Sequence, residues 1–169
     1  MSTPQQILPD LLRPGLKLVF CGTAAGTVSA AQGAYYAGPG NRFWPMLATI
    51  GLTSRRFCPD EFALLLDCGI GLTDVAKTAF GPDAAIPVDA FDRTRLLAAM
   101  NSIQPGCLAF NGKKAASHAL GRPTGQIRYG ALPDISGWPP LVVLPSTSGA
   151  ASGFWDPAPW FALAHRIAS

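Results

Sequence analysis

The chain has 169 residues, 49% of them hydrophobic and 14% charged, so it can bury a sizeable core and is too apolar for a disordered chain. Its formal net charge of +3 permits nucleic-acid binding without requiring it. No apolar run approaches the length of a membrane span, and the N-terminus lacks the pattern of a signal peptide. We therefore expect one domain over residues 1–169, a cytoplasmic location and no membrane contact.

The sequence offers little for a metal or a cofactor, and we expect neither. None of the four cysteines belongs to a Cys-x-x-Cys pair, and there are only two histidines, so zinc and iron–sulfur centres are poorly supported. The small-residue loop at residues 22–26 lacks both the Gly-x-Gly-x-x-Gly and the Gly-Lys-Ser/Thr patterns. A Rossmann-like protein that binds small nucleotides is an alternative, but it rests only on the small residues of this loop.

Strands and helices alternate along the chain. Uninterrupted apolar runs predict buried strands, and helical spacing of apolar residues predicts helices. In chain order, we expect strands at residues 18–21, 70–74, 107–110 and 141–144, and helices at residues 43–50, 61–67, 90–100, 114–120 and from 157 to about 167. Asp89 and Asp156 are predicted to cap the third and the last helix, and residues 125–132 to form a small edge element. This order predicts an α/β fold, a three-layer α/β/α sandwich with a short, mainly parallel central sheet.

Polar and small residues follow each predicted strand, where parallel sheets bind their ligands. These segments are residues 22–26, Asp74, residues 111–113 and residues 146–149. Between the first strand and the first helix lie Tyr35 and Tyr36, a Gly-Pro-Gly turn and Asn41. The pattern predicts a pocket for a flat ligand that stacks on an aromatic ring and meets backbone and amide groups at its edges.

Three segments resemble the uracil-DNA glycosylase superfamily. They are Leu-Val-Phe-Cys-Gly with Gly26, Pro-Gly-Asn-Arg-Phe-Trp at residues 39–44, and Val-Leu-Pro-Ser-Thr-Ser-Gly at residues 143–149. Phe-Asn-Gly-Lys at residues 110–113 is a softer match, and the similarity extends over about residues 6–168. The sequence is most similar to the bacterial mismatch-specific uracil-DNA glycosylases, which are related to thymine-DNA glycosylases. The resemblance implies a metal-free, monomeric and monofunctional enzyme that flips uracil out of DNA and hydrolyses its bond to the sugar, releasing free uracil.

The chain departs from this family at two motifs. Where the branch carries an Asn that orients water, this sequence has Ala24. A family Asn in the last loop is replaced by Ser146, and the residues that wedge into DNA become Gly149, Ala150 and Ser152. A binding module that retained the fold and lost turnover is therefore the main alternative.

Asn41 and Asp74 are the predicted catalytic residues. Asn41 matches the Asn on which the related hypoxanthine-DNA glycosylases are thought to rely, and its alternative role is a helix cap. Asp74 can hold a water or a base edge, and its alternative role is a turn carboxylate. Tyr36 matches the aromatic residue that stacks on the flipped base. The predicted substrate-binding residues are Gly22, Thr23, Ala24, Gly26, Ser29, Tyr36 and Asn111.

Hydroxyl groups and cations near the predicted pocket are expected to contact DNA phosphates, which positions the protein without reading sequence. An ordinary Pro-Ser loop and solvated basic residues are the alternative interpretation. The predicted DNA-binding residues are Arg42, Lys113, Ser146, Thr147, Ser148, Gly149 and Ala150.

Overall fold

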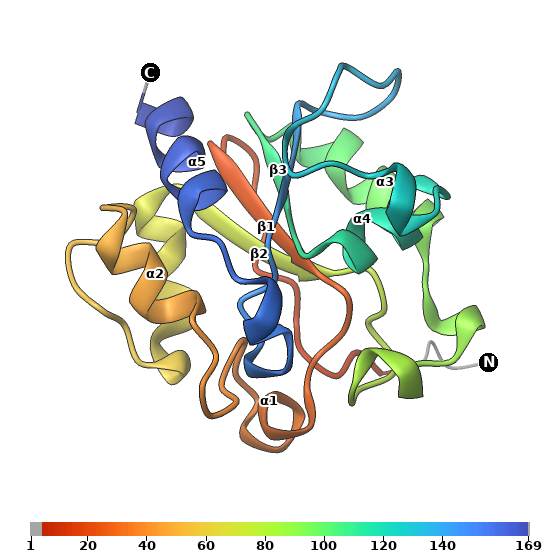
Figure 1. Ribbon diagram of the computed structural model, residues 1–169, viewed down its shortest axis with the longest axis horizontal. Coiled ribbons are helices and arrows are strands. Elements are labelled where there is room, and N and C mark those ends of the chain that lie inside the picture. The colour runs from red at the N-terminus through yellow and green to blue at the C-terminus, as the bar shows by residue number, and fades with distance from the viewer. Residues whose placement is uncertain (1–4, 169) are drawn as a thin grey trace.

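A five-stranded sheet forms the centre of the protein in the computed structural model, which describes residues 5–168 apart from the side chains of Ser152 and Phe154 (Figure 1). Its strands are β1 (Leu18–Gly22), β2 (Ile70–Asp74), β3 (Leu108–Asn111), β4 (Gly130–Ala131) and β5 (Leu141–Leu144). Their order is β2-β1-β3-β5-β4, parallel except for the antiparallel pair of β4 and β5. The four predicted strands and the small edge element are confirmed.

The parallel strands are apolar throughout because both faces of the sheet are covered. Within β1, Leu18 and Phe20 join one core, and Val19 and Cys21 join the other. The first core packs against α2 (Phe43–Thr49), α5 (Ala158–Ala168) and a 3₁₀ helix, η1 (Pro59–Cys68). The second packs against α3 (Arg93–Ile103) and α4 (Lys113–Leu120). Figure 1 shows the two groups of helices on opposite sides of the sheet, as a three-layer α/β/α sandwich requires.

Several helices differ from the prediction in type or bounds. The segment predicted as a helix at residues 61–67 is the 3₁₀ helix η1, and α3 begins at Arg93. The prediction that Asp89 caps this helix is wrong, because Asp89 lies in a separate short 3₁₀ turn, Val88–Ala90. Asp92 caps α3 instead, since its side chain accepts a hydrogen bond from the backbone N–H of Arg95.

The remaining elements are short and lie around the ends of the strands. A helix of six residues, α1 (Thr27–Gln32), was not predicted. Three further 3₁₀ turns are η2 (Asp83–Ala85), η4 (Thr124–Gln126) and η5 (Gly149–Phe154). Asp156 accepts a hydrogen bond from the backbone N–H of Ala158, where α5 begins, as its predicted capping role requires. Within residues 5–168, no helix is both long and apolar enough to cross a membrane.

Candidate functional site

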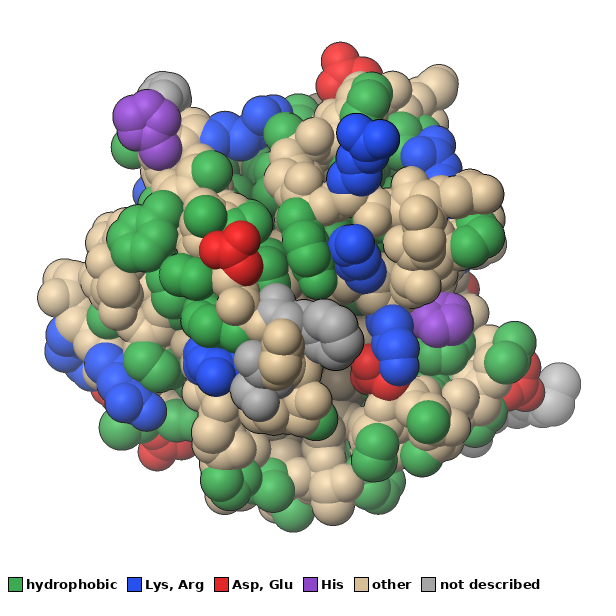
Figure 2. Space-filling view, viewed as in Figure 1, with side chains coloured by type: hydrophobic (Ala, Val, Ile, Leu, Met, Phe, Trp, Pro, Cys, Tyr) green, Lys and Arg blue, Asp and Glu red, His purple; other side chains and the backbone are tan. Residues whose placement is uncertain are grey.

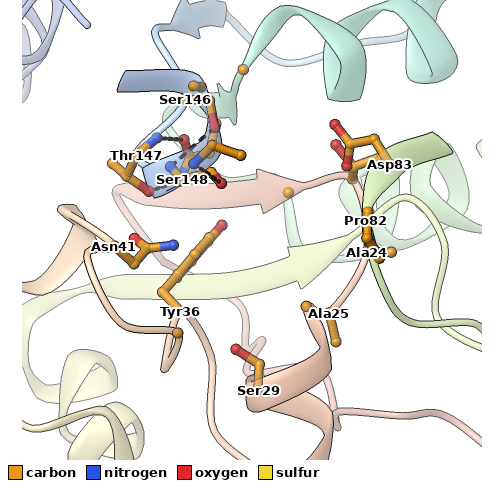
Figure 3. A pocket seen from close by; sticks show the side chains of 18 of the residues that line it. Ala24, Ala25, Ser29, Tyr36, Asn41, Pro82, Asp83, Ser146, Thr147 and Ser148 are labelled. Carbon is orange, nitrogen blue, oxygen red and sulfur yellow. Dashed lines mark hydrogen bonds between the residues drawn. The ribbon is translucent and has the colours of Figure 1, made fainter. Parts of the chain in front are cut away.

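A pocket of about 790 Å³ opens at the edge of the sheet where the parallel strands end. Its lining comes from the segments after β1, β2, β3 and β5, as the order of strands predicts. In Figure 3, Tyr36 and Asn41 lie on one side of the pocket, and Ala24, Pro82 and Asp83 lie on the other. The predicted site residues converge on this pocket with the exception of Arg42.

Gly22, the last residue of β1, leaves room for two polar groups at the buried end of the pocket. A Cβ atom at Gly22 would lie 2.6 Å from Asp74 Oδ1 and 3.1 Å from the hydroxyl of Tyr36. A side chain at this position would therefore collide with the carboxylate and crowd the phenol. Because Gly22 has none, a carboxylate oxygen and a hydroxyl group face the same small space.

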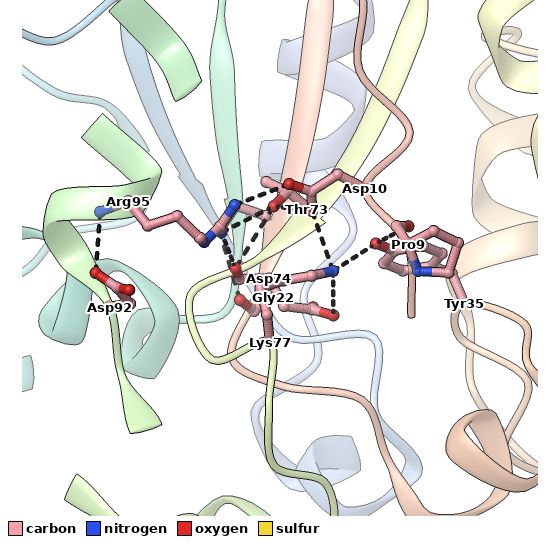
Figure 4. A network of polar contacts seen from close by, with 10 residues as sticks. Pro9, Asp10, Gly22, Tyr35, Thr73, Asp74, Lys77, Asp92 and Arg95 are labelled. Atoms are coloured by element: carbon pink, nitrogen blue, oxygen red, sulfur yellow. Dashed lines mark hydrogen bonds and ion pairs between the residues drawn. The ribbon is translucent and has the colours of Figure 1, made fainter. Parts of the chain in front are cut away.

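Asp74 belongs to a cluster of two acids and two bases beneath the pocket (Figure 4). Lys77 Nζ lies 3.0 Å from Asp10 Oδ1 and 4.0 Å from Asp74 Oδ2. Arg95 Nη1 lies 2.8 Å from Asp10 Oδ2, and Arg95 Nη2 donates to the backbone carbonyl of Asp74 at 2.6 Å. The four charges balance, which reduces the cost of burying Asp74 and Lys77, each less than 5% exposed.

Burial raises the pKa of the Asp74 carboxyl to about 6, because desolvation disfavours its charged form. Lys77 opposes this shift in pKa most strongly, Asp10 adds to it and Arg95 opposes it. Asp74 is therefore a buried acid that changes its charge close to neutral pH. Acids of this kind are typical of functional sites, although structural ion pairs produce them too.

Tyr36 forms one wall of the pocket. Its ring stacks on Phe43 with 4.0 Å between the ring centroids, so Phe43 fixes the plane of the phenol. The backbone of Tyr36 has a φ of 53°, a conformation that residues other than glycine adopt uncommonly. The hydroxyl is buried, lies close to the Asn111 amide and makes no hydrogen bond of full geometry within the described part of the chain. Burial and the Asp74 carboxylate raise its pKa and the Asn111 amide opposes them, so the hydroxyl is neutral at physiological pH.

Asn41 lies at the start of α2, beside Tyr36. Its side-chain oxygen accepts a hydrogen bond from the backbone N–H of Phe43, the first residue of α2, at 3.0 Å. Asn41 thus supports the start of the helix from the position before its N-cap, Arg42. In Figure 3 the amide nitrogen points toward Tyr36 and the pocket. The oxygen thus supports the helix while the nitrogen faces the site, and both roles fit one side chain.

The remaining predicted substrate-binding residues lie around the pocket, and some support its walls. Ser29 accepts a hydrogen bond from the backbone N–H of Ala37, which ties α1 to the segment that carries Tyr36. The amide of Asn111 donates to Thr147 Oγ1 at 2.9 Å and accepts from the backbone N–H of Thr147 at 3.0 Å. Other predicted substrate-binding residues that line the pocket are Thr23, Ala24 and Gly26.

The predicted DNA-binding residues fall into two groups. Lys113 and residues 146–150 line the pocket, with Lys113 Nζ 4.4 Å from the ring centroid of Tyr129. Arg42 lies outside the lining, with its guanidinium 5.0 Å from the ring centroid of Trp155. Its backbone N–H donates to the Thr147 carbonyl, so Arg42 joins α2 to the loop after β5. The Ser152 side chain lies outside the described part of the protein.

Sequence reasoning missed Asp10, Lys77 and Arg95, the partners of Asp74. They come from the lead-in segment, the loop after β2 and α3, so nothing local joins them. Of these three residues, only Lys77 could have been recognised from the sequence as a partner of Asp74, because it stands three residues after Asp74, directly beyond a buried strand. Tyr129 was also missed, since it lies in a segment without a matching motif.

The family model for the uracil DNA glycosylase superfamily matches residues 9–163. The chain belongs to the uracil DNA glycosylase superfamily. A solution NMR structure of a candidate uracil DNA glycosylase from Methanosarcina acetivorans is similar in fold, with a TM-score of 0.66 and 22% sequence identity. The similarity covers 96% of this chain and 97% of that one. Superfamily membership supports a DNA glycosylase that binds DNA and hydrolyses N-glycosyl bonds, whereas the mismatch-specific branch stays a prediction.

Proposed function

We propose that the protein excises uracil from DNA and leaves an abasic site. The observation that carries this proposal is the convergence of the Tyr36 ring, the Asn41 amide and the Asp74 carboxylate on one pocket at the end of the sheet. A DNA glycosylase must take its target base out of the duplex and into such a pocket. Tyr36 offers the flat surface, and base–aromatic stacking contributes about 1–3 kcal/mol per base.

The buried end of the pocket supports recognition of the base edge that lies farthest from the sugar. The base enters first, because its sugar stays attached to the DNA backbone outside. In uracil this far edge carries an N–H flanked by carbonyl groups. An ionised Asp74 accepts a hydrogen bond from that N–H while the base lies on the ring of Tyr36.

The chemical step needs a positioned water rather than a strong nucleophile. The bond between the sugar and the base breaks with its electron pair passing to the base, and water adds to the cationic sugar carbon. The water loses a proton in this step, and a proton neutralises the departing uracil anion, so the products are free uracil and an abasic sugar. Ala24 has no polar group to hold this water, so Asn41 is the proposed replacement, with its amide facing the pocket.

A binding module for uracil-containing or abasic DNA is the second candidate function. Ala24 favours it, because the methyl group stands where an amide is expected and lines the pocket directly. Ser146, Ser148 and residues 149–150 serve both functions in the same way, since their hydroxyl and backbone N–H groups would hold DNA phosphates. Thr147, predicted to bind DNA as well, is fully buried and bonded to Asn111, so it supports this loop from beneath. The two functions therefore differ in turnover and not in binding.

Single-turnover cleavage of uracil-containing single- and double-stranded DNA tests the proposal. We expect the wild type to cut and Asn41→Ala to lose roughly 10²-fold or more in rate while it still binds DNA. Asn41→Ser separates the two roles of this residue, because serine also caps helices but has no amide to extend into the pocket. We expect Asn41→Ser to keep the unfolding temperature and lose the activity.

Asn101→Ala is the matched control, because Asn101 is exposed on α3 and does not line the pocket. It should cut like the wild type. Normal cleavage by Asn41→Ala would reduce Asn41 to a helix cap. A wild type that binds uracil-containing DNA without cutting it would replace the proposed enzyme by the binding module.

A further inference from the structure

Tyr129 is an exposed aromatic residue on the rim of the pocket. Large exposed hydrophobic side chains in the described part of the protein are Leu64, Phe80, Val88, Tyr129 and Phe161. Of these, Tyr129 alone lines the pocket. Its exposure of 39% is poorly explained by core packing, since a ring at this position gains little from burial.

The sheet itself places Tyr129 at this rim. β4 pairs with β5 in the antiparallel direction, with Gly130 opposite Val143 and Ala131 opposite Val142. The residue before Gly130 therefore lies near the carboxyl end of β5. Tyr129 therefore lies at the edge at which the parallel strands end, although β4, the strand that follows it, runs the opposite way. The loop of residues 146–150 begins from the same edge.

Lys113 supports the ring of Tyr129. Its Nζ lies over the ring, 4.4 Å from the centroid, in a cation–π contact. Lys113 is the first residue of α4 and also lines the pocket, so cation and ring approach the rim from adjacent segments. A phosphate contact from Lys113 and a stacking contact from Tyr129 would thus fall on neighbouring parts of one DNA strand.

Among the described side chains of residues 146–151, which follow β5, none is large enough for such a stacking function. The rim residues Gly149 and Ala150 are exposed and too small to replace a nucleobase in a stack. A flipped nucleotide deprives its neighbours of a stacking partner, and exposed aromatic rings stack on any base. We propose that Tyr129 stacks on the nucleobase next to the flipped nucleotide. This inference rests on the proposed function only in that a DNA base enters the pocket.

A double-mutant cycle between protein and DNA tests this stacking. The probe is a single strand with a central 2′-fluorinated uracil nucleotide, because fluorine at this carbon destabilises the cationic sugar and blocks cleavage. A second strand carries the same nucleotide between two sugars that lack bases. We expect Tyr129→Ala to weaken binding of the first strand roughly five- to a hundredfold. It should leave binding of the second strand nearly unchanged.

Control variants complete the cycle. Tyr129→Phe keeps a ring and should bind both strands like the wild type, and Tyr129→Leu should behave like Tyr129→Ala. Phe161→Ala removes an aromatic residue that is 49% exposed on α5 and outside the pocket lining, and it should change neither affinity. An equal loss on both strands, or no loss on either, overturns the stacking proposal.

Cleavage of an unmodified uracil strand by the same proteins separates the two proposals. A wild type that binds but does not cut overturns the proposed excision, and the cycle still reports on Tyr129. A wild type that cuts and shows no coupling with the flanking bases overturns the stacking function alone. A wild type that binds neither strand and does not cut the unmodified one overturns both.

Discussion

Asp74 combines two properties at the residue scale that oppose each other. The carboxyl is 3% exposed, and this burial raises its pKa to about 6. Lys77 and Arg95 oppose the shift, so the group loses its proton near neutral pH in spite of its surroundings. A carboxylate that is ionised at pH 7 and buried beside a hydroxyl is well suited to accept an N–H from a base.

The rate of uracil excision should therefore depend on pH through Asp74. We expect kcat/KM to fall as the pH decreases through about 6, with a one-proton slope, because protonation of the free enzyme replaces the charged acceptor of Asp74 by a weaker neutral one. Asp74→Asn has a neutral acceptor at every pH, so its rate should be lower throughout and this acidic limb should disappear. Rates measured from roughly pH 4.5 to 8 would test this expectation.

Asp134→Asn is the control for this pH profile, because Asp134 is exposed and lies outside the pocket lining. It should keep the wild-type limb. Persistence of the limb in Asp74→Asn would assign it to another group. The other groups to consider are the charged or titratable residues that interact with Asp74, namely Asp10, Lys77, Arg95, Tyr35, Tyr36 and Cys21.

The tether between β3 and the loop after β5 acts at the scale of elements. Asn111, the last residue of β3, bonds both the side chain and the backbone N–H of Thr147. Both residues are buried, so their hydrogen bonds have no water to replace them. The tether fixes residues 146–148 against the sheet and shapes that side of the pocket.

Removal of this tether should cost both stability and DNA affinity. We expect Asn111→Ala to lower the free energy of unfolding by about 1–3 kcal/mol, because it leaves a buried N–H of Thr147 without an acceptor. Chemical denaturation measures this loss, and binding of a uracil-containing strand measures the loosened loop. The exposed Asn101→Ala should change neither quantity. An unaltered Asn111→Ala variant would show that the loop holds its place without this residue.

The sequence predicted the strands better than the helices, for physical reasons. A buried parallel strand must be apolar on both faces, and the runs at residues 18–21 and 141–144 show this directly. The start of α3 was misplaced because Asp89 and Asp92 are both plausible caps, and only the contact with Arg95 distinguishes them. The six-residue α1 was missed because no side chain caps it.

Predicting the site depended on the sheet as well. Asp74 ends β2 and Asn111 ends β3, the parallel strands on either side of β1, so their convergence at one edge of the sheet follows from strand order alone. The charged cluster around Asp74 could not be predicted in this way, because Asp10 and Arg95 lie 85 residues apart in the chain and meet only in the folded protein. Tyr129 required knowledge that β4 runs antiparallel, which its two residues do not reveal.

Basic side chains differ in what they can offer DNA. In Figure 2, Lys and Arg side chains lie on both halves of the face, and those on the right lie where Figure 1 places α4 and the segment after it. Lys113 and Lys114 of α4 belong to the pocket lining. Arg55, in contrast, is paired with Glu61 at 2.7 Å and has less charge to offer DNA. The α4 side of the pocket is therefore the side on which DNA phosphates are favoured.

The two lysines of α4 at the pocket predict the salt dependence of DNA binding. Each phosphate that a lysine neutralises releases condensed counterions, so the logarithm of affinity falls with the logarithm of salt concentration. We expect Lys114→Gln to reduce the magnitude of that slope by about 1, and to weaken binding similarly for every sequence. Lys17→Gln is the control, because Lys17 is exposed immediately before β1, at the end of the strand away from the pocket. It should keep the wild-type slope, because no phosphate at the pocket lies within its reach.

Binding isotherms at several salt concentrations measure both slopes. An equal change of slope in the two variants would mean that the lysines act through the net charge of the protein rather than through contacts along a defined path of the DNA.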